Sequence, residues 1–221
     1  REAIEELAIS RLPGFYGYDP IKDIQVLTPM RKGEAGVLAL NKSLQKALNP
    51  PSPAKAEKLF GEETYRVGDK VMQIRNNYQA IWTVDVDGRP HEEGEGIFNG
   101  DFGFIKAIDD EEGVVTVLFD DDREVEYELK QMDDLRLAYA TTIHKSQGSE
   151  FPAVIIPLFS GPPMLLTRNL LYTAVTRARD LVVLVGEKRY MYQMIRNNTI
   201  AKRYSSLDTK LRNYFHFIMN S

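Results

Sequence analysis

The densest group of chemically capable side chains lies in 139–151, which reads YATTIHKSQGSEF. Hydroxyl groups and a lysine suit the oxygens of phosphates, and Gly148 lets a ligand approach the backbone closely. Glu150 can accept a hydrogen bond from a sugar hydroxyl. Because the segment follows an expected strand, it falls where ligands bind in open α/β sheets. Composition alone favours a simpler interpretation, a polar surface loop.

Two further segments carry arginines beside expected helices. In 171–180 (LYTAVTRARD), Arg177 and Arg179 stand at a helix end, next to an apolar strand. An arginine on a rigid element can neutralise charge on a transferred phosphoryl group. Cations at a helix C-terminus also satisfy the helix dipole, and the residues alone favour that second role. In 25–33 (QVLTPMRKG), Arg31 lies between a strand and a helix whose N-terminus can bind an anion.

Residue content excludes several kinds of site. The chain has no cysteine and only three histidines, which excludes disulfides and thiolate ligands and argues against a histidine-rich metal site. It contains no Gly-Lys dipeptide, and therefore no P-loop of the form G-x-x-x-x-G-K-[ST]. The stretch 114–122 (VVTVLFDDD) imitates a magnesium-binding strand, but the alternating residues after it favour a hairpin. We therefore expect no metal site in this chain.

Hydrophobic periodicity predicts an α/β unit at both ends of the chain. Helical spacing over 2–12 ends at Pro13 and Gly14, and 37–48 is also helical. The run 181–185 (LVVLV) is fully apolar, as is typical of a strand in a buried parallel sheet. The remaining expected elements are strands at 24–28, 137–141 and 153–158 and helices at 167–177 and from 187 to about 195.

The middle of the chain predicts a small antiparallel β-barrel inserted into that α/β unit. Residues 65–75 suggest a strand pair or a bent strand, and 81–97 suggests a loop or a loose hairpin. Short β runs follow at 101–108, 114–119 and 124–129. We expect three parts: 1–63 as the first part of the α/β domain, 64–134 as the barrel, and 135–221 as the rest of the α/β domain with a tail.

Charge is distributed unevenly. Residues 101–134 hold 13 acidic and 3 basic side chains, whereas 168–221 hold 10 basic and 3 acidic ones, within a net charge of −4. A basic face can meet phosphates while an acidic lobe points elsewhere, although charges also simply decorate solvated surfaces. No apolar run approaches the roughly 20 residues that span a bilayer, and the first residues do not resemble a signal peptide. We expect no membrane partner and a cytoplasmic location.

Taken in order, the three segments resemble the C-terminal motor half of superfamily 1 DNA helicases, in the RecD/TraA-like group of the exodeoxyribonuclease V alpha-chain type. QVLTPMRKG resembles motif IV, ATTIHKSQGSEF motif V and LLYTAVTRAR motif VI. The likeness covers roughly residues 20–205. It implies a RecA-like parallel sheet flanked by helices, and it identifies the inserted barrel as Src-homology-3-like.

The resemblance also implies roles for individual residues. Arg177 matches the arginine finger that touches the γ-phosphate of ATP. The positions near the nucleotide are Gln147, Gly148, Glu150 and, by a loose alignment, Arg31. The positions near the backbone of single-stranded DNA are Thr142, His144 and Lys145. ATP and Mg²⁺ are the implied cofactors, and the polarity of the group is 5′ to 3′.

The family places the phosphate-binding loop and the magnesium ligands in a first motor domain, so the resemblance implies that this chain is part of a longer protein and inactive alone. The implied partners are that domain, single-stranded DNA and possible subunits of a nuclease complex.

Two alternatives stay open. The chain can be a non-catalytic module that binds nucleic acid or protein. It can also be a nuclease if the acids at 109–112 and 120–122 bind magnesium, although solvated turns explain them better. The tail 213–221 departs from the family.

Overall fold

The computed structural model describes residues 1–221 except 87–88, 120–121, 200–205, 207–209 and 216–221, and it describes no side chains within 85–91. Its first sheet has four strands in the order β11–β1–β12–β13, and each neighbouring pair is parallel. The strands are β1 (Ile24–Thr28), β11 (Ala140–Thr142), β12 (Phe151–Leu158) and β13 (Ala178–Gly186). This confirms the expected parallel α/β sheet, which we call the motor sheet.

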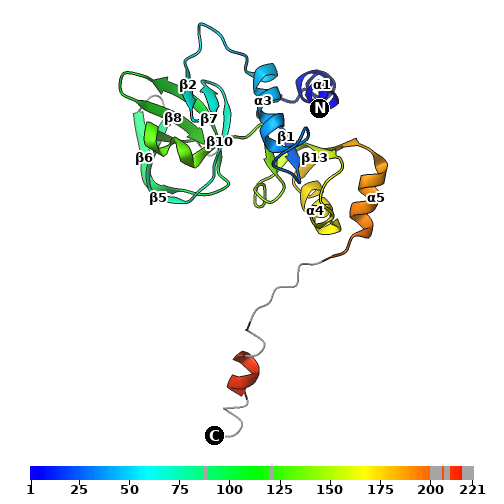
Figure 1. The fold of residues 1–221 in the computed structure, drawn as a ribbon. Coiled ribbons are helices and arrows are strands. Elements are labelled where there is room, and N and C mark those ends of the chain that lie inside the picture. The colour runs from blue at the N-terminus through cyan, green and yellow to red at the C-terminus, as the bar shows by residue number, and fades with distance from the viewer. Residues whose placement is uncertain (87–88, 120–121, 200–205, 207–209, 216–221) are drawn as a thin grey trace.

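Helices surround the motor sheet (Figure 1). They are α1 (Glu2–Glu6), the π-helical η1 (Leu7–Arg11), α2 (Leu12–Tyr16), α3 (Val37–Leu48), the 3₁₀ turn η3 (Pro163–Leu165), α4 (Arg168–Val175) and α5 (Lys188–Arg196). The first helical stretch continues beyond Pro13, where it was expected to stop. Pro13 stands in the first turn of α2, just after the wider π-helical turn, and a proline is tolerated in a first turn. The stretch ends at Gly17, whose φ of 72° is left-handed.

The middle of the chain forms an antiparallel sheet of seven strands in the order β10–β4–β7–β8–β9–β5–β6 (left in Figure 1). These are β4 (Lys70–Gln73), β5 (Asn77–Val86), β6 (Arg89–Ile97), β7 (Phe102–Asp109), β8 (Val114–Phe119), β9 (Arg123–Glu128) and β10 (Leu135–Leu137). A hairpin of β2 (Glu57–Phe60) and β3 (Glu63–Arg66) precedes it, and a 3₁₀ turn, η2 (Leu129–Asp134), joins β9 to β10. We call residues 57–137 the insert.

The insert confirms two interpretations of the sequence. Residues 81–86 and 89–97 belong to a hairpin of β5 and β6, as the second of the two interpretations of 81–97 expected. Residues 114–119 of the stretch that imitates a magnesium-binding strand form β8, which pairs antiparallel with β7 and with β9. It is therefore a hairpin strand of the insert.

The single strand expected at 137–141 is wrong. The chain forms β10 in the insert and then β11 in the motor sheet. Between them the backbone passes from one sheet to the other, since Ala138 N donates to the Lys70 carbonyl of β4 at 2.8 Å and the Tyr139 carbonyl accepts from Val26 N of β1 at 3.3 Å. Side chains also bind this stretch. Asn41 Nδ2 donates to the carbonyls of Leu137 and Ala140, both at 2.9 Å, and Asn41 Oδ1 accepts from Ala140 N at 2.8 Å. The Gln25 amide donates to the carbonyl of Ala138 at 3.0 Å.

The expectation that 181–185 is fully buried is also wrong. Among the described residues, β13 pairs only with β12, so it forms an edge of the motor sheet. Leu184 is 39% exposed. A run of apolar residues does not by itself distinguish a central strand from an edge strand.

One apolar core joins the two sheets. The same buried cluster contains Val26 and Leu44 of the motor part and Val117 and Tyr127 of the insert. Burial of such side chains contributes roughly 1.5–3 kcal/mol each. The insert is therefore packed against the motor sheet rather than tethered to it.

Candidate functional site

The segment between β11 and β12 reaches both ends of the motor sheet. Thr142 pairs with Thr28 at the carboxyl ends of β11 and β1. Phe151 begins β12 two residues before Ala153, which lies opposite Ile24 at the amino end of β1. Only the first part of the segment therefore stands at strand carboxyl ends, where the whole of it was expected, and 148–150 stand at the amino end of β12.

Buried side chains fix the path of this segment. Ile143 and Ser146 are both fully buried, and Ser146 Oγ donates to the Ile143 carbonyl at 2.9 Å. The backbone turns tightly, since Lys145 N donates to Thr142 O at 2.9 Å and Ser149 N to Ser146 O at 3.1 Å. The polar residues at its two ends are thus held by one anchored turn.

Arg177 lies against the second end of that turn. It follows α4 and immediately precedes β13, and its side chain is half-buried. Its Nη1 donates to the Ser149 carbonyl at 3.0 Å and its Nε to the Thr173 carbonyl at 3.3 Å. Its own carbonyl accepts from Phe151 N at 2.8 Å. The arginine therefore both satisfies the last turn of α4 and stands beside residues 147–150.

The charge of Arg177 is not neutralised by its neighbours. Across the described residues, no carboxylate lies within salt-bridge distance of its guanidinium, and its partners are neutral oxygens. Gly148 has a left-handed φ of 96° and faces open space. Gln147 and Glu150 are exposed. Together these residues offer a cationic group, an accessible backbone and a carboxylate to a ligand from outside.

A second group gathers around Lys145. This lysine is half-buried, and burial lowers its pKa, helped by the positive charge of Arg31. Thr142 is half-buried and His144 is exposed. Arg31, also exposed, follows the carboxyl end of β1, whereas Arg177 precedes the amino end of β13. Arg31 and Lys145 thus follow the carboxyl ends of the paired strands β1 and β11, whereas Arg177, with which the resemblance grouped Arg31, precedes the amino end of β13.

A small cavity lies between the residues that lead into β7 and residues 149–151, which stand beside Arg177. It has a volume of about 290 Å³ and is lined by Gly100, Asp101, Phe102, Arg123, Ser149, Glu150 and Phe151. The sequence did not reveal this proximity, because the two lining stretches are some fifty residues apart. The insert therefore borders the candidate site.

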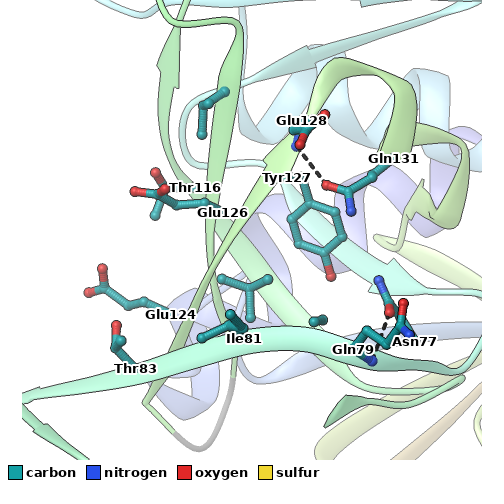
Figure 2. A pocket seen from close by; sticks show the side chains of 13 residues that line it. Asn77, Gln79, Ile81, Thr83, Thr116, Glu124, Glu126, Tyr127, Glu128 and Gln131 are labelled. Atoms are coloured by element: carbon teal, nitrogen blue, oxygen red, sulfur yellow. Dashed lines mark hydrogen bonds between the residues drawn. The ribbon is translucent and has the colours of Figure 1, made fainter. Parts of the chain in front are cut away.

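A larger pocket, of about 640 Å³, lies on the insert itself (Figure 2). Its charged lining residues are Glu124, Glu126 and Glu128 of β9, opposite Ile81 and Gln79 of β5. Carboxylates repel phosphates, so this pocket is unsuited to a nucleic-acid backbone.

Acidic clusters do not form a metal centre in the described part of the chain, where no group of three or more His, Cys, Asp or Glu is arranged to hold an ion. In the cluster at 109–112, Asp109 Oδ1 accepts from the backbone of Glu111 at 2.8 Å and of Glu112 at 2.9 Å, as in a solvated turn. Of the cluster at 120–122, residues 120 and 121 lie outside the described residues, as do 216–221 of the tail.

None of the described helices has the length and apolar character needed to traverse a lipid bilayer.

Comparison with known proteins gives two family matches. Residues 40–119 match the ATP-dependent RecD-like DNA helicase SH3 domain, and residues 137–185 match the UvrD-like helicase C-terminal domain. The first covers most of the insert, and the second covers the segments that hold Lys145, Gly148 and Arg177.

Individual relatives agree with these matches. The ATP-dependent RecD2 DNA helicase of Deinococcus radiodurans is 38% identical over 157 residues, which are 71% of this chain and 19% of the relative. The RecBCD enzyme subunit RecD of Mycolicibacterium smegmatis is 31% identical over 188 residues, 85% of this chain and 29% of the relative. The chain thus spans less than a third of either relative. A crystal structure of Pif1 helicase from Bacteroides in complex with ADP-AlF3 and ssDNA has a TM-score of 0.49 at 21% identity, covering 97% of this chain and 49% of that one.

Proposed function

Because the chain belongs to the RecD-like DNA helicases of superfamily 1 and corresponds to their C-terminal region with its SH3-like insert, we propose that it is the second motor half of an ATP-dependent 5′–3′ DNA helicase. Its partners are single-stranded DNA and a first motor domain of the same parent protein. We propose the subunits of a nuclease complex as further partners, on the support of the name of one relative, RecBCD enzyme subunit RecD.

The observation that carries the proposal is the contact between Arg177 and the Ser149 carbonyl, at 3.0 Å. It joins motif VI to motif V at one end of the motor sheet. ATP and Mg²⁺ fit this arrangement as ligands shared with another domain: an un-neutralised arginine, the open backbone at Gly148 and the Glu150 carboxylate suit a phosphate and a ribose. The family resemblance assigns the magnesium ligands to the first motor domain.

The residues of this chain then act by binding and orientation. Arg177 places positive charge beside a transferring phosphoryl group, an effect worth roughly 10³–10⁵ in rate in related enzymes. Gln147, Gly148 and Glu150 orient the nucleotide. Thr142, His144 and Lys145 contact the DNA backbone, and we add Arg31 to this group because it follows the carboxyl end of β1, the strand paired with β11, and its charge helps to lower the pKa of Lys145.

Motif V couples the two ligands in this proposal. Its DNA end and its nucleotide end are separated only by the turn anchored at Ile143 and Ser146. A movement of Arg177 and Ser149 toward a nucleotide is therefore transmitted to Lys145. The chain alone, without a phosphate-binding loop, is expected not to hydrolyse ATP.

DNA contact by Lys145 is tested by titrating the chain with fluorescently labelled oligothymidylate at several salt concentrations. Lys145→Ala is expected to weaken binding and to reduce the slope of log affinity against log salt by about 0.7, the release expected for one phosphate contact on a single strand. Lys130→Ala removes the same charge from an exposed lysine of the insert that pairs with Glu128. Equal slopes for the two variants would contradict the assignment of Lys145.

The alternative function, a non-catalytic binding module, is favoured by one feature, the acidic pocket of Figure 2. Its three glutamates suit a basic segment of another protein rather than a nucleic acid. Binding of the chain to a lysine-rich peptide, lost when Glu126 and Glu128 become Gln, together with salt-independent or absent DNA binding, would support this alternative over the helicase.

A further inference from the structure

The turn that joins β6 to β7 contacts motif V at one well-defined point. Asn99 Oδ1 accepts a hydrogen bond from Lys145 Nζ at 2.5 Å, and the Ile74 carbonyl lies 3.4 Å from the same nitrogen. Both acceptors belong to the insert and both are neutral. An ammonium has three donors, so these bonds fix its position without neutralising its charge.

The turn itself is held firmly. Backbone N–H groups of three consecutive residues bind neighbouring oxygens: Asn99 to Asn76 Oδ1 at 2.9 Å, Gly100 to Gln73 O at 2.9 Å and Asp101 to Phe98 O at 3.0 Å. Asp101 Oδ2 in addition accepts from Phe98 N at 3.0 Å and from Arg123 Nη2 at 3.1 Å. The amide oxygen of Asn99 is therefore presented from a rigid support.

The insert also contacts the other end of motif V. Phe102, at the start of β7, meets Phe151, at the start of β12, edge to face with ring centroids 5.3 Å apart. The ammonium of Lys70 lies 5.8 Å and 5.4 Å from these two centroids and donates to the Ile21 carbonyl at 2.9 Å. Both ends of segment 145–151 are thus packed on the insert.

Resting on the proposed function, in which Lys145 contacts DNA, we propose that Asn99 is a positioning residue that holds the Lys145 ammonium where a DNA phosphate binds. A free lysine side chain loses rotamer entropy when it is fixed, and a pre-positioned one avoids part of that loss on binding. In this way the insert strengthens the binding of DNA by Lys145, although the acidic surface of the insert is itself unsuited to a phosphate backbone.

The test compares Asn99→Ala and Asn99→Asp with the unmodified chain in the oligothymidylate titration. Asn99→Ala releases the ammonium and is expected to weaken binding by roughly three- to tenfold with the salt slope retained. Asn99→Asp forms an ion pair with Lys145, so it is expected to weaken binding further and to lower the slope by about 0.7. Gln131→Glu makes the same amide-to-carboxylate change elsewhere on the insert and keeps an acceptor for Glu128 N, so it should bind as the unmodified chain does.

A second readout needs no DNA. In an NMR titration of the lysine ammonium groups, Asn99→Asp is expected to raise the pKa of Lys145, because an opposite charge favours the protonated form, and Gln131→Glu is expected to leave it unchanged. If Lys145→Ala weakens DNA binding while both Asn99 variants bind as the unmodified chain does, the positioning role is wrong and the proposed function stands. If the unmodified chain shows no salt-dependent binding, both are wrong.

Discussion

Arg177→Ala is expected to lower ATP turnover by the full-length parent helicase by roughly 10³-fold or more, with little loss of stability. The side chain is half-buried and its hydrogen bonds go to neutral oxygens, so its removal leaves no buried charge behind. The loss should fall on turnover rather than on DNA binding, because Arg177 lies at the amino end of β13, away from the residues assigned to DNA. Steady-state hydrolysis at saturating single-stranded DNA measures it.

Two variants sharpen this result. Arg179→Ala removes an exposed arginine two residues away on β13 and should leave turnover within about twofold. Arg177→Lys keeps the positive charge but not the planar guanidinium with its fixed donors, so it should recover only part of the lost ATP turnover. Normal turnover in Arg177→Ala, or equal losses in both arginine variants, would reject the assignment of the finger.

Asp69→Ala is expected to destabilise the chain by roughly 3 kcal/mol or more. The Asp69 side chain is fully buried and accepts from Gln45 Nε2 at 2.6 Å and from Asn49 Nδ2 at 2.7 Å. It also accepts from Tyr139 Oη at 2.8 Å and from Arg66 N at 2.7 Å. Each buried donor left without a partner costs about 1–3 kcal/mol. Because these donors come from α3, β3 and the crossing to β11, the loss should loosen the insert from the motor sheet.

Chemical denaturation followed by circular dichroism measures this effect. Asp110→Ala is the control, since Asp110 is exposed and pairs with Lys58 at the surface, where a salt bridge contributes about 1 kcal/mol at most. Equal destabilisation by the two substitutions would show that the Asp69 network does not join the two parts.

Asp69 also gives a pH dependence. Burial raises the pKa of this carboxyl above 3.8, and the four hydrogen bonds offset that effect only in part. The folded chain then holds the proton more tightly than the unfolded chain does. Stability therefore falls as the pH rises from about 4 through the folded-state pKa. Asp69→Asn, which cannot ionise, should remove this part of the slope.

Local sequence patterns predicted much of the fold, because the elements concerned depend on interactions between residues that are close in sequence. The bounds of β1 and α3 agree with the sequence, since an apolar run ending at a proline and a helical repeat between Gly36 and Asn49 need no distant partner. The break between β10 and β11 was missed because it depends on Asn41 and Gln25, about a hundred residues away. The exposure of β13 depends on sheet order, which periodicity does not encode.

The residues of the candidate site were chosen by type and spacing and stay predictions. The contacts of Ser149 with Arg177 and of Asn99 with Lys145 were not predicted, and neither was the buried network of Asp69, because each joins residues distant in sequence. One signal was available. Asn41, Gln45 and Asn49 recur every four residues, which predicts that they share one face of the helix at 37–48 and its C-cap.

The central claim is that the ATP site is shared between this chain and a first motor domain. The most direct test measures ATP hydrolysis, with single-stranded DNA present, by this chain alone, by the first motor domain of its parent alone, and by the two mixed. The proposal predicts negligible turnover for each part and restored turnover for the mixture, which Arg177→Ala in this chain abolishes. ATP hydrolysis by this chain alone, or turnover by the mixture that Arg177→Ala leaves unchanged, would contradict the proposal.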